Sequence, residues 1–230
     1  MSLTAAAVIF DLDGTLIDSL ADLGESMNTV LSARGFPTHP LERYKRFVGD
    51  GMVNLVRRAL PQIPQEARTV EACVGEMRTV YRGRWDQKTR LYPGIAELLD
   101  ALVRRRLPLA VLSNKPDDSA RLAVERLLAP WRFALVVGTR PGLPQKPDPA
   151  GARLIARELE IDPAHVVYLG DTDTDMRTAV AAGMYAVGAA WGFRTVEELM
   201  ATGARALVKQ PLELLDVVDA PLPSHGSYPP

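Results

Sequence analysis

The sequence has a single cysteine and almost no net charge. Its one cysteine, Cys73, excludes an intrachain disulfide, and no cluster of cysteine and histidine offers a zinc site. Twenty-seven basic and 28 acidic side chains leave a net charge of −1, which excludes a globally basic surface for nucleic acid or anionic lipid. We therefore expect a protein of the reducing cytoplasm that binds neither nucleic acid nor membranes.

Long hydrophobic runs are also missing. The apolar run from Ala5 to Phe10 ends at Asp11, which is too short for a signal peptide or a membrane span, so we expect neither secretion nor insertion. With 47% hydrophobic and 24% charged residues among 230, the chain has the composition of a globular protein. Its length allows one large domain or two.

The apolar run at residues 5–10 predicts a strand that is buried on both faces. Apolar residues then recur every three or four positions from Leu16 to Leu31, which predicts an amphipathic helix that stops at residues 34–37. Further helical pattern covers residues 41–47, 52–60 and 65–85, and no second strand is predicted before residue 107. Residues 16–91 are therefore expected to form an all-helical segment.

Beyond residue 92 the pattern changes to an alternation of helices and strands. Helices are predicted at residues 95–106, 119–128, 149–159 and 176–182, and strands at residues 107–112, 133–137, 166–169 and 185–187. Such an alternation predicts an α/β fold with a parallel sheet, which the first strand must join. We expect a core of residues 1–15 and 92–220, a helical insertion at 16–91, and a solvated, proline-rich tail at 221–230.

Acidic residues follow two of the predicted strands. Asp11 and Asp13 end the first strand, and Asp171, Asp173 and Asp175 follow the strand at 166–169. Because ligands of open α/β sheets bind at the carboxyl ends of the strands, we expect the two clusters to face one point, where their oxygens would suit Mg²⁺. A calcium loop is the alternative, but Leu16 and Met176 stand where such loops need glycine.

Two further loops contribute polar side chains to the same region. Ser113, Asn114 and Lys115 end the strand at 107–112, and Lys146 lies in the loop that precedes the helix at 149–159. The chain has only five lysines against 22 arginines, and two of the five occur in these loops. Hydroxyl, amide and ammonium groups beside a metal predict a cradle for phosphate.

The four segments together resemble the motifs of the haloacid dehalogenase superfamily. In this sequence the motifs are Asp11-x-Asp13-Gly14-Thr15, Ser113 with Asn114, Lys146, and Gly170-Asp171-x-x-x-Asp175. The resemblance implies a Rossmann-like parallel sheet with the helical insertion as a type 1 cap. The second aspartate, Asp13, is absent from the dehalogenases themselves and indicates the phosphatase branch.

By this resemblance the catalytic residues are Asp11, the nucleophile that forms an aspartyl-phosphate, and Asp13, the general acid and base. The Mg²⁺ ligands would be the carboxylates of Asp11 and Asp171 and the backbone carbonyl of Asp13, with Asp175 orienting Lys146 or metal-bound water. The residues implied in substrate binding are Thr15, Gly49, Ser113, Asn114 and Lys146.

The loop at residues 48–52, which contains Gly49, is similar to the cap loop of the phosphoglycolate phosphatases. With Lys45 and Arg46 it would recognise the leaving group of a small phosphorylated metabolite such as 2-phosphoglycolate. Three alternatives stay open: a phosphosugar mutase of the β-phosphoglucomutase type, a phosphonate hydrolase using Lys45, and a non-catalytic metal-binding interaction protein. We expect a monomer or a homodimer.

Overall fold

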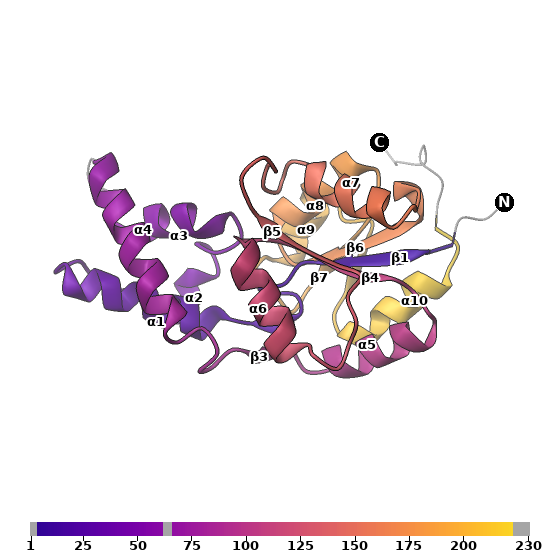
Figure 1. Cartoon of the computed structure of the whole chain (residues 1–230), viewed down its shortest axis with the longest axis horizontal. Helices are drawn as coiled ribbons and strands as arrows, with labels where there is room; N and C mark the ends of the chain where they lie inside the picture. Colours follow the sequence, from indigo (N-terminus) through magenta and orange to yellow (C-terminus); the bar gives the residue numbers. More distant parts are fainter. Residues whose placement is uncertain (1–3, 62–65, 223–230) are drawn as a thin grey trace. The chain divides into compact units, whose positions relative to one another are not determined.

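The computed structural model describes residues 4–61 and 66–222. The chain divides into two compact units, one made of the residues up to Leu16 together with those from Leu91 onward, the other made of Ile17–Arg90 (Figure 1). Within the described residues, no helix combines the length and the apolar character needed to cross a bilayer.

The larger unit is built on a six-stranded parallel sheet with the strand order β5-β4-β1-β6-β7-β8. Its strands are β1 (Ala7–Phe10), β4 (Leu109–Pro116), β5 (Leu135–Thr139), β6 (Val166–Gly170), β7 (Tyr185–Ala189) and β8 (Ala206–Val208). β1 lies between β4 and β6, and all four of its residues are buried, as its unbroken apolar sequence predicts. The predicted α/β class with a parallel sheet is confirmed.

Helices cover both faces of this sheet. They are α5 (Ile95–Arg104), α6 (Asp117–Leu127), α7 (Ala150–Glu158), α8 (Asp173–Ala182), α9 (Val196–Ala201) and α10 (Leu214–Asp219), with short 3-10 turns at Pro163–His165 and Pro211–Glu213. Figure 1 shows α7 and α8 on one side of the sheet and α5 and α10 on the other. Ile9 and Tyr168 of the sheet pack with Ile155 of α7 and Met176 of α8 in one buried core.

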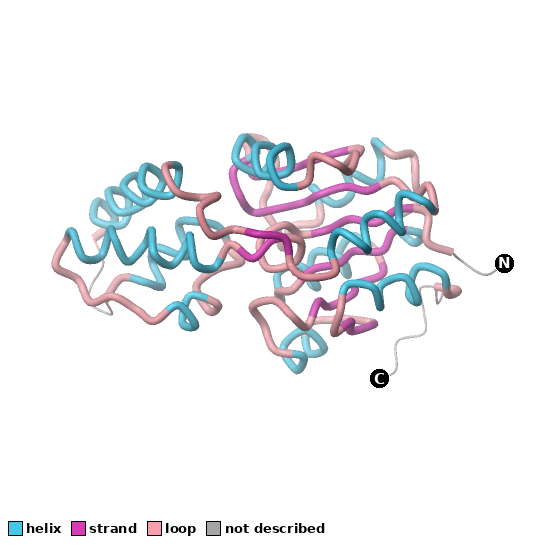
Figure 2. Tube along the Cα trace, turned by 90° about the horizontal axis from the view of Figure 1, so that it is seen from below, coloured by secondary structure: helices cyan, strands magenta, loops and turns pink. Residues whose placement is uncertain are grey.

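The smaller unit is helical. It contains α1 (Leu20–Ala33), α2 (Leu41–Tyr44), α3 (Gly51–Ala59) and α4 (Ala67–Arg82), and a two-stranded sheet of β2 (Ile17–Asp18) and β3 (Arg90–Leu91) joins its two ends (Figure 2). Met27, Tyr44, Val56 and Met77 are fully buried, so each helix contributes to the core of this unit. The predicted all-helical character holds apart from the two short strands.

Several predicted boundaries are wrong by a few residues. The strand expected at 107–112 runs from Leu109 to Pro116, and the strand expected at 133–137 runs from Leu135 to Thr139. The helix expected to begin at Met176 begins at Asp173. Both strands continue past their last apolar residue, and the helix begins on polar residues, whereas the apolar residues 107–108 and 133–134 lie before the strands start.

Other differences concern elements that are too short to leave a periodic pattern. The prediction of no second strand before residue 107 is wrong, since β2 and β3 are strands of two residues each. Leu222, which the sequence pattern places in the solvated tail, is buried. The remainder of that predicted tail, 223–230, lies outside the described residues.

A buried carboxylate ties the beginning of the helical unit to its end. Asp22 of α1 is fully buried and accepts hydrogen bonds from the backbone N–H of Lys88 at 2.9 Å and of Thr89 at 2.8 Å. The Thr89 hydroxyl donates a third hydrogen bond to the same oxygen at 2.8 Å. These hydrogen bonds tie the segment just before β3 to α1, and so fix the point at which the chain leaves the helical unit.

We predict that Thr89→Val lowers the free energy of unfolding by about 1–2 kcal/mol, because a buried carboxylate loses one of its donors while side-chain volume is conserved. Urea denaturation followed by circular dichroism measures the change. Thr79→Val is the matched control, because the Thr79 hydroxyl is exposed and bonds only within its own helix to the Gly75 carbonyl. If both substitutions lowered the free energy of unfolding equally, the hydrogen bond from Thr89 to Asp22 would not stabilise the fold as predicted.

Candidate active site

Asp11 lies where β1 ends, next to the end of β6. Its backbone N–H donates to the Leu169 carbonyl at 2.9 Å, and its side chain is buried. The chain then turns through Gly14, whose φ of +95° is one that glycine adopts readily. A Cβ atom at Gly14 or at Gly192 would collide with the Asp171 side chain. Two glycines therefore let the backbone approach Asp171 from both sides.

Lys146 links two of the carboxylates. Its Nζ lies 2.8 Å from Oδ1 of Asp11 and 2.6 Å from Oδ1 of Asp175, and its side chain is only 3% exposed. Asn114 at the end of β4 holds the lysine in place: its Oδ1 accepts from the Lys146 N–H at 2.9 Å, and its Nδ2 donates to the Lys146 carbonyl at 3.1 Å. Two strand-end loops thus fix one ammonium against the end of β1.

Asp175 is held by protein groups on both of its oxygens. In addition to Lys146, the Tyr168 hydroxyl donates to Oδ1 at 3.2 Å. Thr172 donates to Oδ2 from its hydroxyl at 2.6 Å and from its N–H at 3.0 Å, and the Asp175 N–H bonds back to the Thr172 hydroxyl. This capping box begins α8, so the same bonds that start the helix also orient Asp175.

Asp171 is fully buried and hydrogen-bonded on both oxygens. The Thr15 hydroxyl donates to its Oδ1 at 2.8 Å, and the Phe193 N–H donates to its Oδ2 at 2.8 Å. Thr15 is itself held by the Trp191 side chain, whose Nε1 donates to the Thr15 carbonyl at 3.0 Å. The segment after β7 therefore positions the loop after β1 and the carboxylate after β6 together.

Burial and neighbouring charges shift the pKa values of the ionisable groups in this site. Burial, followed by the charge of Asp175, raises the pKa of Asp11 well above its usual value, although Lys146 acts in the opposite direction. Burial and the charge of Asp175 likewise raise the pKa of Asp171 to about 7, against the hydrogen bonds from Phe193 and Thr15. Burial lowers the pKa of Lys146, but the charges of Asp11 and Asp175 outweigh it and raise that pKa well above normal.

The donor set fits a divalent cation. Asp11, Asp171 and Asp175 each offer a carboxylate oxygen, and these oxygens lie within 4.8 Å of one another. The charge of Asp175 contributes to the raised pKa values of Asp11 and Asp171, so a divalent cation among these carboxylates would relieve their mutual repulsion. Asp175 accepts hydrogen bonds from Lys146, Tyr168 and Thr172, which is one donor residue more than Asp171, which accepts from Thr15 and Phe193.

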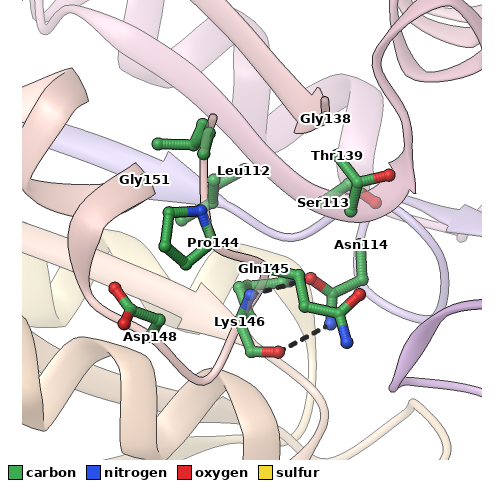
Figure 3. A pocket seen from close by; sticks show the side chains of 11 residues that line it. Leu112, Ser113, Asn114, Gly138, Thr139, Pro144, Gln145, Lys146, Asp148 and Gly151 are labelled. Atoms are coloured by element: carbon green, nitrogen blue, oxygen red, sulfur yellow. Dashed lines mark hydrogen bonds between the residues drawn. The ribbon is translucent and has the colours of Figure 1, made fainter. Parts of the chain in front are cut away.

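A small pocket lies between the ends of β4 and β5. Ser113, Asn114 and Lys146 all line it, together with Gly138 and Thr139 of β5 (Figure 3). The figure also shows the two hydrogen bonds by which the Asn114 amide holds the Lys146 backbone. The three residues expected to form a phosphate cradle thus belong to one pocket.

A second lysine contact was not among the expected site interactions. Lys115 Nζ lies 3.0 Å from Oδ1 and 3.4 Å from Oδ2 of Asp13, and both side chains are largely buried. The sequence did carry a signal for it, because Lys115 is one of the two lysines in the strand-end loops. Its partner could not be identified there, since 102 residues separate the pair.

The expected cap residues belong to the helical unit, whereas the site described above consists of residues of the larger unit. Gly49 precedes α3 with a φ of +120°, and the neighbouring Asp50 forms an ion pair with Arg58. Lys45 pairs with Glu42 at 2.8 Å and is partly exposed. A role of Gly49 in substrate binding stays a prediction.

Comparison with known proteins adds a family relationship. Residues 8–189 match the haloacid dehalogenase-like hydrolase family. Among curated relatives, a phosphoglycolate phosphatase of Xanthomonas campestris pv. campestris is 32% identical over 94% of this chain and 98% of its own. One from Pseudomonas syringae pv. tomato is 30% identical over 81% of this chain and 70% of its own. The resemblance expected from the four motifs is confirmed.

Solved structures show the same fold. A crystal structure from Lactobacillus delbrueckii subsp. bulgaricus has a TM-score of 0.87 and 28% identity, and the match covers 95% of this chain and 99% of that one. A predicted phosphatase from Clostridium acetobutylicum has a TM-score of 0.82 and 25% identity, with 94% and 99% covered. The arrangement of elements is therefore shared along nearly the whole chain.

The raised pKa values predict how stability depends on pH in metal-free protein. Because the folded state holds protons on Asp11 and Asp171 more tightly than the unfolded state, the free energy of unfolding should fall as pH rises from 5 towards 8. The slope is at most about 1.4 kcal/mol per pH unit for each titrating carboxylate. Carboxylates with a lowered pKa, such as Asp117, titrate below this range.

Urea denaturation in the presence of a chelator at pH 5, 6, 7 and 8 measures this slope. Asp171→Asn should reduce it, whereas the control Asp216→Asn, at an exposed position of α10, should keep it. A slope unchanged by Asp171→Asn would show that the buried acids do not titrate as described.

Proposed function

The chain belongs to the haloacid dehalogenase-like hydrolase family, and on that premise we propose that it is a Mg²⁺-dependent phosphatase acting on a small phosphorylated metabolite such as 2-phosphoglycolate. One observation carries the proposal: the Asp11 carboxylate lies against the Lys146 ammonium and within the acidic cluster of Asp171 and Asp175. A nucleophile, a fixed cation and a cation-binding set thus meet at one strand end.

Asp11 is the proposed nucleophile. One of its carboxylate oxygens attacks phosphorus, a new oxygen–phosphorus bond forms, and the bond between phosphorus and the ester oxygen breaks. Asp13 gives its proton to the departing alkoxide, which leaves as an alcohol. Asp13 then takes a proton from water as the water oxygen attacks the aspartyl-phosphate, which releases inorganic phosphate and restores the Asp11 carboxylate.

The cationic part of the site makes this attack possible. A carboxylate and a phosphate monoester repel each other, and Lys146 places positive charge 2.8 Å from Oδ1 of Asp11. Mg²⁺, held by Asp11, Asp171 and the Asp13 carbonyl, would supply further charge neutralisation for the phosphoryl oxygens. Asp175 acts through Lys146 by fixing its ammonium, while Asn114 fixes its backbone.

The remaining residues bind the phosphoryl group or support the residues that do. Ser113 is the proposed hydroxyl donor to a phosphoryl oxygen, and the pocket that it shares with Asn114 and Lys146 supports this assignment. The Thr15 hydroxyl bonds to Asp171, so Thr15 contributes by orienting a metal ligand. The direct substrate contact expected for Thr15 from the sequence stays a prediction.

The substrate is proposed from the relatives and from the cap. Curated relatives at 30–32% identity are phosphoglycolate phosphatases, and the insertion carries the glycine loop at Gly49 that we propose to close over the leaving group. A cytoplasmic location agrees with the one cysteine, Cys73, which is a free and buried thiol. The expectation of a monomer or homodimer stays a prediction.

Asp11→Asn should reduce phosphate release from 2-phosphoglycolate by at least about 10⁴-fold, because the amide cannot form the acyl phosphate. The fold should survive, since the two side chains are nearly isosteric. Phosphate release by the purified variant and its thermal unfolding are measured together. Asp216→Asn, in the exposed part of α10, is the matched control with parental turnover. Turnover of Asp11→Asn within a few-fold of the parent would overturn the nucleophile assignment.

Activity should disappear on exhaustive chelation and return with Mg²⁺, whereas Ca²⁺ should inhibit. Both ions prefer oxygen ligands, but Ca²⁺ accepts more of them at longer distances and would disturb in-line attack. Phosphate release in chelator-treated protein, titrated with each ion alone and with both together, checks the prediction. Full activity without a divalent cation would exclude the proposed metal dependence.

A further inference from the structure

We infer that Lys115 recognises the leaving group of the substrate, so that the site selects phosphomonoesters carrying a carboxylate on the carbon attached to the ester oxygen. The inference rests on the proposed function, because it uses the position that Asp13 must take beside the ester oxygen. It assigns the recognition of the anionic leaving group to the parallel-sheet core, whereas the sequence pattern placed it in the cap at Lys45.

The two lysines of the site contact different carboxylates. Lys146 contacts Asp11 and Asp175, so its charge serves the side where the nucleophile meets phosphorus. Lys115 extends from the end of β4, the strand beside β1, and its ammonium meets both oxygens of Asp13 at 3.0 and 3.4 Å. Because Asp13 serves the departing alkoxide, the Lys115 charge lies on the leaving-group side.

Burial makes this charge effective. The Lys115 side chain is 7% exposed and that of Asp13 is 14% exposed, so solvent screens the pair only weakly. A lysine ammonium has three donors and acts as a compact point charge, so it can contact Asp13 and a second anion at once. A substrate carboxylate that reaches this ammonium therefore gains a charge-assisted hydrogen bond in a poorly screened place.

The distances allow that contact for a short leaving group. A general acid lies about 2.6–3.2 Å from the oxygen that it protonates, so the Lys115 Nζ lies within about 6–7 Å of the ester oxygen. In 2-phosphoglycolate the carboxylate carbon is two covalent bonds from that oxygen, which brings its oxygens into reach. An aryl phosphate places no acceptor there, and a neutral amide offers Lys115 an acceptor without charge, which makes a weaker hydrogen bond.

Three substrates distinguish recognition of the carboxylate from the ability to hydrolyse any phosphate ester. They are 2-phosphoglycolate, its neutral analogue 2-phosphoglycolamide, and p-nitrophenyl phosphate. We expect the parent protein to prefer the carboxylate over the amide by at least about tenfold in kcat/KM, the effect of one charge-assisted hydrogen bond. Lys115→Met should remove this preference, mainly by raising KM for 2-phosphoglycolate. Lys115→Arg should keep part of it, because the positive charge is retained.

Lys209→Met is the matched control, because Lys209 is an exposed lysine of the same unit, beyond β8. It should keep both the parental activity and the parental preference. Circular dichroism of every variant, together with the turnover of p-nitrophenyl phosphate, shows whether the site is still folded. Should Lys115→Met fail to fold, the parent and Lys115→Arg still give the preference for the carboxylate.

The outcomes separate this inference from the proposed function. Hydrolysis of p-nitrophenyl phosphate by a parent protein that treats the carboxylate and the amide alike would leave the phosphatase assignment intact and overturn the role of Lys115. A Lys115→Met variant that loses activity equally on all three substrates would make Lys115 a positioning residue for Asp13 only, which also overturns it. A parent protein inactive on every phosphomonoester would overturn the proposed function itself.

Discussion

Mutual repulsion among three buried carboxylates is the constraint on which the site depends. Asp11, Asp171 and Asp175 approach one another at the ends of β1 and β6, and Lys146 supplies positive charge between two of them. Burial makes this repulsion costly, as the raised pKa values of Asp11 and Asp171 show. Much of the surrounding structure holds the charges in place: glycines admit Asp171, a capping box orients Asp175, and Asn114 anchors the backbone of Lys146.

The parallel sheet explains why these groups meet. Strands β4, β1 and β6 are neighbours, so the loops after them emerge at one edge although they lie far apart in the sequence. Each loop contributes a different chemical group to that edge, with carboxylates after β1 and β6 and a hydroxyl, an amide and an ammonium at the end of β4. In the proposed division of labour, Lys146, in the loop between β5 and α7, serves the nucleophile, and Lys115, at the end of β4, serves the general acid.

The position of the helical insertion matters for the same reason. The chain leaves the sheet directly after the loop from Asp11 to Thr15 and returns at Leu91, and β1 and β4 still pair side by side. An insertion between two neighbouring strands leaves their pairing intact, so the core tolerates a separate unit there. Its ends are joined by β2 and β3 and tied by Asp22, which gives the helices a defined beginning and end.

The sequence by itself determined the fold class, the family and the residues at the strand ends. Apolar runs at β1 and β6 identify buried parallel strands, and acids that follow such runs must share one edge of the sheet. Only the tertiary structure decided which side chains contact one another. It showed the hydrogen bond of Thr15 to Asp171, the hydrogen bonds between the Asn114 amide and the Lys146 backbone, and the ion pair of Lys115 with Asp13. Periodicity reports which face of an element is buried, whereas these contacts join side chains from loops far apart in sequence, whose meeting depends on how the strands are ordered.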